Sequence, residues 1–433
     1  RTPKRPMFTP ASRPGASTML RLAARRFHAT PRPQAKVLAV LYPDPVGGYP
    51  PKYAREDVPS IGVYPDGQRT PAPLGLDFVP GELVGCESGA LGLRGFLERD
   101  GHTLVVTTDK DGEGCAFERE LPDADFVISQ PFFPAYMDAR RLAMAKKLKA
   151  CITAGIGSDH VDLAEAMRRK VDVCEVTFSN SVSVAEHTVM QMLALVRNFV
   201  PSHRIVADQG GWNIADAASR SYDIEGMHVG TVAAGRIGLA VLRRLRPFGV
   251  RLHYTDRHRL PAEVESELTL TYWPTWEEMV PHLDCVTLHC PLHPETEGMV
   301  NDRTIGLFKR GAYVVNTARA KLCDRDTIVR ALESGQLAGY AGDVWFPQPP
   351  PADHPWRKMP HSAMTPHVSG TSLSAQARYA AGTREILEAY FSGEPIRREY
   401  QIVTDGQLAG AGAHSYSEGN ATGGHAGGKG KGK

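Results

Sequence analysis

A glycine-rich turn at residues 233–238, with the sequence A-A-G-R-I-G, is the feature that most limits how this chain can fold. It follows a strand-like run, H-V-G-T-V-A, and opens a segment with a helical pattern. In such a unit Gly235 lets the backbone approach a pyrophosphate, and Gly238 lets the helix pack close to its strand. The N-terminus of the helix then offers N–H groups to phosphates. Ala233 stands where the usual fingerprint has its first glycine, so the turn alone is a partial match.

Asp256 strengthens the interpretation of this turn as a dinucleotide site. It ends the next strand-like run, V-R-L-H-Y-T, about 20 residues after the glycines, where a carboxylate can accept both hydroxyls of an adenosine ribose. A carboxylate there also repels a 2′-phosphate, which favours NAD over NADP, although Arg257 beside it weakens that exclusion. The alternative is an aspartate that only caps a turn.

Strand-like and helical patterns alternate from Lys36 onward. The β-rich runs include residues 102–108, 125–130, 284–289, 312–317 and 337–344. Such alternation predicts an α/β fold with doubly wound parallel sheets. Because 433 residues exceed one ordinary core, we expect two Rossmann-like domains with an active-site cleft between them.

The domain boundaries follow from these patterns. We expect a substrate domain at residues 36–180 and 369–424 and an NAD-binding domain at residues 181–368. Residues 43–80, rich in Pro, Gly and Asp, are predicted to form a surface insertion.

The composition excludes several classes of protein. With 42% hydrophobic and 23% charged residues and a formal net charge of +2, the chain is typical of globular proteins and gives no reason to expect nucleic acid as a partner. No apolar run approaches the ~20 residues that a membrane helix needs. The seven cysteines are scattered and form no C-x-x-C pair, so we expect buried thiols, a reducing compartment and no metal centre.

Residues 1–35 contain no acidic side chain but carry one lysine and seven arginines. Leu20, Ala24 and Phe27 would share one helical face, a pattern typical of an organelle-targeting segment. This predicts a mitochondrial protein; the alternative is a disordered leader on a cytoplasmic one. In either case the leader is excluded from the fold, as are residues 425–433, which we expect to be a disordered tail.

A proline-rich loop lies within residues 341–370 and is bracketed by two polar side chains, Gln348 and His367. The prolines exclude a helix and restrict the backbone dihedrals of the loop. A loop of this length without secondary structure is uncommon unless it has a function. We expect His367 to lie on a short strand that closes the loop. If it pairs with Gln348, the histidine is held by a neutral amide rather than by a carboxylate.

Arg319 follows another strand-like run, V-V-N-T-A, at the edge where open α/β sheets bind ligands. Its guanidinium can grip a carboxylate with two parallel hydrogen bonds; the alternative is a surface ion pair with Asp324 or Asp326. With a nicotinamide site and a later histidine, it predicts a dehydrogenase of a small carboxylate. A 2-hydroxy acid requires a histidine that takes a hydroxyl proton, tuned by a carboxylate. Formate has no such proton, so a Gln348–His367 pair favours formate.

A long helix with the sequence V-A-E-H-T-V-M-Q-M-L-A-L-V-R-N-F is predicted after Ser183. Ser183 and Glu186 stand three residues apart at its start, which is a capping-box pattern. Because the helix is apolar on most faces, it is an inter-domain spine, a subunit interface or a merely buried helix.

Eight motifs together make the chain similar to the NAD-dependent, metal-free formate dehydrogenases of the D-2-hydroxyacid dehydrogenase superfamily. The motifs are T-A-G-I-G-S-D-H-V-D-L (153–163), N-S-V-S-V-A-E-H (180–187), G-T-V-A-A-G-R-I-G (230–238), H-Y-T-D-R-H-R (253–259), C-P-L-H-P-E-T-E (290–297), N-T-A-R (316–319), G-D-V-W-F-P-Q-P (342–349) and M-T-P-H-V-S-G-T-S (364–372). The resemblance runs from about Lys36 to Gly424. It implies formate as substrate and a homodimer, which favours the interface interpretation of the long helix.

The resemblance also implies roles for individual residues. Arg319 and Asn180 would hold the formate carboxylate, together with the backbone of Ile156. His367, oriented by Gln348, would lie beside it. Pro131, Phe132 and Phe133 would form an apolar wall that excludes water. Asp343 would place the nicotinamide carboxamide. The implied NAD contacts are Ser181, Ala233, Gly235, Arg236, Ile237, Gly238, Asp256, Arg257, Pro291, Leu292, His293, Pro294, Glu295, Thr317, Asp343, His367, Val368, Ser369 and Gly370.

Three residues depart from the family pattern. Phe133 stands where Trp is frequent, Ala320 where Gly usually follows the arginine, and His289 where Asn is common. The methyl group of Ala320 could crowd its loop if the position needs positive φ. None of the three removes a group that the reaction requires. Two other functions stay open, namely a glyoxylate or hydroxypyruvate reductase, which would want Glu at position 348, and an NAD sensor without turnover.

Overall fold

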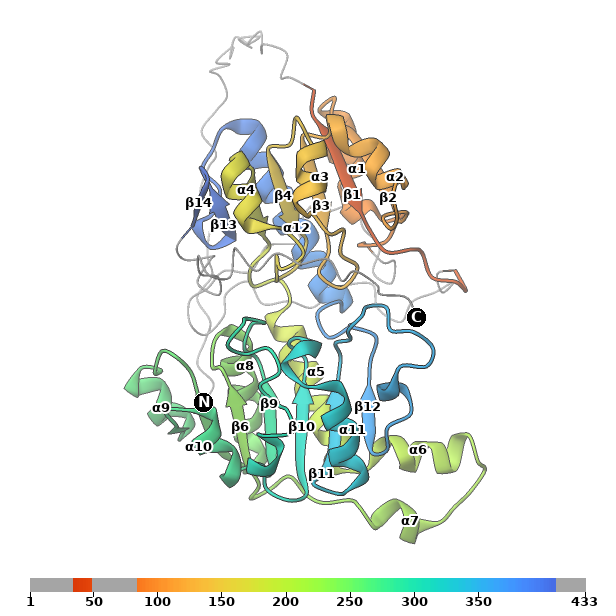
Figure 1. The fold of residues 1–433 in the computed structure, drawn as a ribbon, viewed down its shortest axis with the longest axis vertical. Helices are drawn as coiled ribbons and strands as arrows, with labels where there is room; N and C mark the ends of the chain where they lie inside the picture. The colour runs from red at the N-terminus through yellow and green to blue at the C-terminus, as the bar shows by residue number, and fades with distance from the viewer. Residues whose placement is uncertain (1–33, 49–83, 410–433) are drawn as a thin grey trace, which may run out of the picture. The chain divides into compact units, whose positions relative to one another are not determined.

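The computed structural model describes residues 34–48 and 84–409, which build two seven-stranded sheets with helices on their faces (Figure 1). The fold is therefore α/β with two doubly wound sheets, as predicted. The expectations for the leader up to residue 33, for residues 49–80 of the insertion and for the tail lie outside the described residues.

The first sheet has the strand order β14-β13-β5-β4-β3-β1-β2. Its strands are β1 (Lys36–Val40), β2 (Thr103–Thr107), β3 (Phe126–Ser129), β4 (Ala150–Thr153), β5 (Asp172–Glu175), β13 (Gln401–Thr404) and β14 (Gln407–Leu408). Strands β1 to β5 run parallel to one another, whereas β13 is antiparallel to β5 and β14 to β13. The sequence patterns did not predict this antiparallel edge.

The second sheet has the order β12-β11-β10-β9-β6-β7-β8 and is parallel throughout. Its strands are β6 (His228–Val232), β7 (Arg251–Thr255), β8 (Thr271–Tyr272), β9 (Cys285–Leu288), β10 (Ala312–Asn316), β11 (Leu337–Gly342) and β12 (Ser362–Met364). From β6 the strand order runs to one edge through β7 and β8, and from β9 it runs to the other edge through β10, β11 and β12. The order of the strands therefore reverses between β6 and β9. Open α/β sheets bind ligands at the carboxyl ends of strands beside such a reversal.

Both faces of each sheet are buried, so consecutive strand residues enter opposite cores. In β1, Val37 and Ala39 pack on one side and Leu38 and Val40 on the other.

The first part of the chain contributes the helices α1 (Arg94–Arg99), α2 (Ala116–Glu120), α3 (Ala139–Met144) and α4 (Leu163–Arg169). They are followed by α5 (Ser181–Val196), α6 (Phe199–Ala207), α7 (Ile214–Ala218), α8 (Arg236–Leu245), α9 (Ala262–Leu268), α10 (Trp276–Met279), α11 (Arg325–Glu333) and α12 (Leu373–Ser392).

The long helix α5 begins earlier than its sequence pattern indicated. It starts at Ser181, after Asn180, and has no side-chain cap. Ser183 therefore lies inside the first turn, where its hydroxyl is 2.8 Å from that of Ser372 on the segment leading into α12. The predicted capping box is wrong because Ser183 bonds across the chain rather than to its own helix. The helix packs against α8, β10 and β11.

His367 does not lie on a strand, contrary to the prediction. Strand β12 ends at Met364, and His367 has a φ of 58°. The carboxylate of Asp343 accepts hydrogen bonds from the backbone N–H groups of Val368 and Ser369, both at 2.8 Å. These bonds hold the chain off the extended path at the end of the loop.

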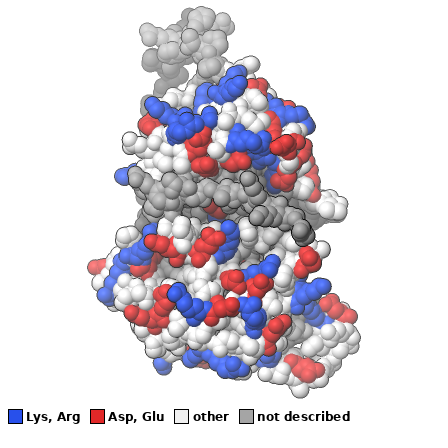
Figure 2. Space-filling view, in the orientation of Figure 1, with Lys and Arg blue, Asp and Glu red and all other residues white. Residues whose placement is uncertain are grey.

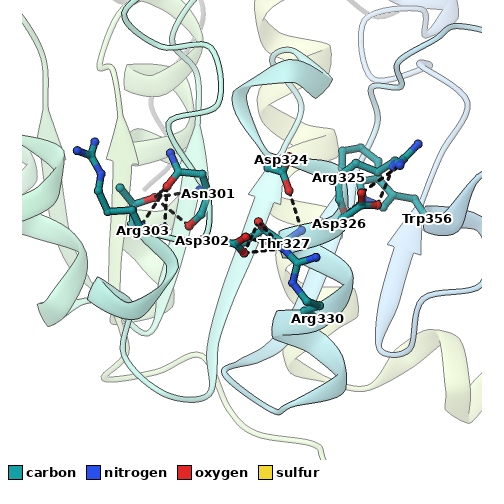
Figure 3. A network of polar contacts seen from close by, with 10 residues as sticks. Asn301, Asp302, Arg303, Asp324, Arg325, Asp326, Thr327, Arg330 and Trp356 are labelled. Atoms are coloured by element: carbon teal, nitrogen blue, oxygen red, sulfur yellow. Dashed lines mark hydrogen bonds and ion pairs between the residues drawn. The ribbon is translucent and has the colours of Figure 1, made fainter.

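Two tryptophans fix the proline-rich loop to the second sheet. Trp345 Nε1 donates to the carbonyl oxygen of Thr365 at 2.8 Å, and Trp356 Nε1 donates to that of Arg325 at 3.0 Å. Trp356 is only 2% exposed, and Figure 3 shows it beside the Arg325–Asp326 ion pair at the start of α11. The loop therefore has a defined shape where it leads to Gln348.

The surface carries charges of both signs, and the cysteines lie in the interior. Basic and acidic side chains are interspersed on the face drawn in Figure 2. Within the described ranges, no helix is both long enough and apolar enough to cross a membrane. All seven cysteines are buried.

Candidate active site

One pocket collects residues from loops that follow strands of both sheets. Among the predicted site residues, those that line it are Pro131, Phe132, Ile156, Asn180, Ser181, Gly235, Arg236, Ile237, Gly238, Pro291, Leu292, Thr317, Arg319, His367, Ser369 and Gly370. The structure thus brings most of the predicted set together.

Other predicted residues do not line this pocket: Phe133, Ala233, Asp256, Arg257, His293, Pro294, Glu295, Asp343, Gln348 and Val368. Several lining residues were not predicted as site residues: Gly157, Asp159, Glu175, Val184, His289, Cys290 and Ala318. Asp159 lies within the sequence motif at residues 153–163. Glu175 is the last residue of β5, and this position at a strand end is the sequence signal that could have identified it as a site residue.

The glycine-rich turn has the geometry that a pyrophosphate needs. Within residues 34–48 and 84–409, a Cβ on Gly235 would meet no atom within 4 Å, so these residues leave the space in front of it open. Gly235 is also the N-cap of α8 and offers no side chain to cap it. A Cβ on Gly238, by contrast, would lie 2.1 Å from the carbonyl oxygen of Ala233. Gly238 therefore keeps the helix against its strand, and Gly235 leaves room for a ligand at the helix N-terminus.

Asp256 ties this turn to the end of β7. Its carboxylate accepts from the N–H of Ala234 at 2.8 Å and from the N–H of His258 at 3.0 Å. The turn-capping alternative is therefore part of what Asp256 does. Each carboxylate oxygen has a further acceptor site, so these bonds do not preclude ribose hydroxyls.

Two buried polar atoms at the start of α5 fit a ligand. Asn180 Oδ1 and Ser181 Oγ are buried and have no hydrogen-bond partner among the residues that the structure describes, and both residues line the pocket. Unsatisfied buried polar atoms are costly and uncommon. A Cβ on Gly370 would lie 2.7 Å from Asn180 Nδ2, so only glycine leaves room for this amide. Together with the open space at Gly235, the residues present fit a dinucleotide and a small polar substrate.

Arg319 reaches the pocket from the segment after β10. It forms an ion pair with Asp159, whose Oδ1 lies 2.7 Å from Nη2. The alternative partners proposed from the sequence are engaged elsewhere, because Asp324 caps α11 at the N–H of Thr327 and Asp326 pairs with Arg325 (Figure 3). Arg319 is thus a pocket residue whose partner also lines the pocket.

His367 and Gln348 do pair, with Nδ1 and Oε1 2.8 Å apart. Gln348 Nε2 donates to the carbonyl oxygen of Phe132 at 2.8 Å, so its amide oxygen must face the histidine. His367 therefore donates from Nδ1. Burial lowers the pKa of His367 to about 4, so the imidazole is neutral at neutral pH.

Glu175 is a buried carboxyl group that lines the same pocket. It accepts from the N–H of Gly157 at 2.9 Å and from the hydroxyl of Ser158 at 3.3 Å. Burial raises the pKa of Glu175 to about 7, although these hydrogen bonds and the charges of Arg236 and Arg319 oppose the rise. Its charge therefore changes near neutral pH.

The three departures from the family pattern are accommodated. Ala320 opens a short 3-10 helix and is not among the described residues with positive φ, so its methyl group causes no backbone strain. Burial lowers the pKa of His289 to about 3, and its neutral ring contacts the Thr287 hydroxyl. Phe133 lies under the ammonium group of Lys110, which is 4.6 Å from the ring centroid.

Fold and site together define a class of protein. The sequence of residues 189–369 matches the protein family described as D-isomer specific 2-hydroxyacid dehydrogenase, NAD binding domain. The protein is thus an NAD-dependent oxidoreductase of that class.

Relatives narrow the class. The chain is 69% identical to the formate dehydrogenase of Pseudomonas sp. (strain 101) over 390 residues, which cover 90% of this chain and 97% of the relative. It is 50% identical to the chloroplastic/mitochondrial formate dehydrogenase of Arabidopsis thaliana, covering 76% of this chain and 85% of the relative. The structure of NAD-dependent formate dehydrogenase from Staphylococcus aureus in complex with NAD matches with a TM-score of 0.70 and 39% identity, covering 85% and 99% of the two chains. This chain belongs to the formate dehydrogenase family.

Proposed function

We propose that the protein oxidises formate to CO2 and reduces NAD+ to NADH. Arg319 and Asn180 hold the formate carboxylate, with the backbone of Ile156 as a further donor. The observation that carries this proposal is the hydrogen bond between His367 and Gln348, 2.8 Å long, beside the arginine. Burial keeps the histidine neutral, and among the described residues its hydrogen-bond partner is an amide rather than a carboxylate, as suits a substrate that has no proton to give up.

The residues of this chain contribute positioning and a suitable electrostatic environment. Arg319 binds and orients the substrate anion, and Phe132 and Pro131 keep water from the reacting carbon. The ring of Phe132 lies 6.4 Å from that of His367 and fixes one wall of the site. NAD+, when bound, supplies the hydride acceptor at C4 of its nicotinamide.

The cofactor is held by the second sheet. Gly235 and the N-terminus of α8 receive the pyrophosphate, Asp256 the adenosine ribose, and Ser181 a further polar group of the dinucleotide. We accordingly assign residues 181–368 to the NAD-binding domain and residues 36–180 and 369–424 to the substrate domain.

Two incubations test the activity. The protein is mixed with formate and NAD+, and separately with glyoxylate and NADH, and absorbance of NADH is followed. We expect NADH formation in the first mixture. Turnover in the second mixture alone would assign the protein to the hydroxyacid reductases, and NAD binding without any turnover would make it a sensor.

We also propose that two copies form a homodimer. No residue of α6 or α7 is buried, and Figure 1 shows these helices as an arm beyond α5. The arm and its flanks expose Phe199 (60%), Trp212 (79%) and Ile214 (71%). Apolar side chains gathered in this way mark association sites. Light scattering should give twice the chain mass, and a Trp212→Glu, Ile214→Glu variant should give the mass of one chain.

The leader is the basis of a proposal on location. Residues 1–35 have a basic, acid-free composition, and the related Arabidopsis protein is named chloroplastic/mitochondrial. We propose import into mitochondria. A fluorescent fusion carrying residues 19–40 should reach mitochondria, whereas a cytoplasmic signal would reject the proposal.

A further inference from the structure

Asp159 faces the arginine that the proposed function assigns to formate. Its oxygens accept from Nη2 of Arg319 at 2.7 Å and from Nε at 3.3 Å. A guanidinium offers two forked edges, Nε with Nη2 and Nη1 with Nη2. Asp159 occupies the first edge, and Nη1 donates to the carbonyl oxygen of Ala318 at 2.8 Å. A substrate carboxylate is therefore gripped by the remaining N–H groups of the second edge, unless it displaces Asp159.

The contact is built into the turn that carries Asp159. Gly157 lies directly against the guanidinium, since a Cβ there would be 2.1 Å from Arg319 Nη2. The N–H of Gly157 is held by the buried carboxyl group of Glu175 at 2.9 Å. The turn therefore fixes Asp159 and the backbone of Gly157 on the same side of Arg319.

Asp159 is ionised at neutral pH. Partial burial raises the pKa of its carboxyl group, but the neighbouring Arg319 outweighs this effect and holds the pKa below its ordinary value. The pair as a whole has no net charge, so its attraction for an anion is weaker than that of an arginine alone.

A weaker attraction between Arg319 and the formate anion suits the charge change of the reaction. Formate carries one negative charge, and that charge leaves with the hydride, so the carbon group ends as neutral CO2. A strong cation would stabilise the bound anion more than the transition state, which lowers kcat.

We infer that Asp159 is a positioning residue for formate oxidation, which holds the guanidinium of Arg319 side-on and weakens its grip on the ground-state anion. The inference rests on the proposed role of Arg319. It goes beyond substrate binding, because it states how the site favours hydride transfer over tight binding of formate.

The test is Asp159→Asn, which keeps the shape and one acceptor but removes the charge. We expect the formate KM to fall about tenfold and kcat to fall by a similar factor, because the bound anion gains more stabilisation than the transition state. A purely structural role predicts the opposite sign for KM, since a misplaced arginine binds formate less well. The matched control is Asp162→Asn, because Asp162 caps α4 at the N–H of Glu165 and asparagine caps equally well.

A second measurement does not depend on turnover. Nitrate is a planar anion that carries no hydride, and its affinity for the NAD+-loaded protein should rise about tenfold in Asp159→Asn. A formate KM that is unchanged or higher in the variant overturns the inference while formate oxidation by the wild type stands. Absence of formate turnover in the wild type rejects the proposed function itself.

Discussion

The two halves of the pocket are built in different ways. The half at α8 uses backbone groups of one continuous turn, tied to the next strand by Asp256. The half around Arg319 uses side chains from segments far apart in the chain, such as Asp159, Gln348 and His367. The first half should therefore respond to any added Cβ and the second to any change of charge or donor.

Arg319→Lys should have the largest effect, because lysine keeps the charge but loses the forked geometry that grips both Asp159 and a carboxylate. We expect kcat/KM for formate to fall roughly a hundredfold or more, while the KM for NAD+ changes little. Steady-state kinetics with each substrate varied in turn measures both.

Arg330→Lys is the matched control. Arg330 pairs with Asp302 at 2.6 Å on the surface, with both side chains more than half exposed (Figure 3). Exposed pairs contribute little, so the kinetics should stay within about twofold of wild type. An equal loss in both variants would contradict the specific role of Arg319.

Gln348→Glu should rank second. The new carboxylate would face the carbonyl oxygen of Phe132, where Nε2 now donates at 2.8 Å, and would raise the pKa of His367 from its present value of about 4. We expect kcat for formate to fall roughly tenfold and to become pH-dependent.

Gln336→Glu provides the comparison for this variant. Gln336 also donates to a backbone carbonyl, that of Phe308 at 2.9 Å, but outside the pocket. The Gln336→Glu variant should have a lower free energy of unfolding, but its kcat should depend on pH as in the wild type. A Gln348→Glu enzyme with full, pH-independent activity would show that the amide does not select formate.

Substitutions of the two glycines in the half of the pocket at α8 should have smaller effects, and the two variants should differ in whether stability also changes. Gly235→Ala should raise the KM for NAD+ about tenfold without loss of stability, because its Cβ meets only the space left for the ligand. Gly238→Ala should lower the melting temperature as well, since its Cβ would overlap Ala233. Gly306→Ala, which meets no atom within 4 Å, is the control for both.

Glu175 should give the smallest kinetic effect and a defined dependence of stability on pH. Because its folded pKa is raised to about 7, above the unfolded value, its contribution to stability is present at low pH and is lost as pH rises through 7. Glu175→Gln should therefore gain of order 2 kcal/mol in unfolding free energy, relative to wild type, between pH 5 and pH 8. Denaturant unfolding at both pH values measures it; equal differences would contradict the raised pKa.

The comparison also explains what could be predicted from the sequence. The parallel sheets and the glycine-rich turn follow from local periodicity and spacing. The Asp159–Arg319 pair could not be derived in this way, because 160 positions separate the two residues and only the packing of the two sheets joins them. The turn at His367 was missed for the same reason, since the Asp343 carboxylate that holds it comes from another strand end.

The most direct test of the central claim is the pH dependence of kcat for formate and for deuterated formate in the wild-type protein. With a neutral His367 and no acid–base step, kcat should be constant between about pH 6 and pH 9, with the same isotope effect throughout. Any effect of Glu175 should then be confined to the formate KM. A kcat that changes about tenfold per pH unit within this range would contradict the account, because it would place a proton transfer in the step that Gln348 and His367 are proposed to leave free of one.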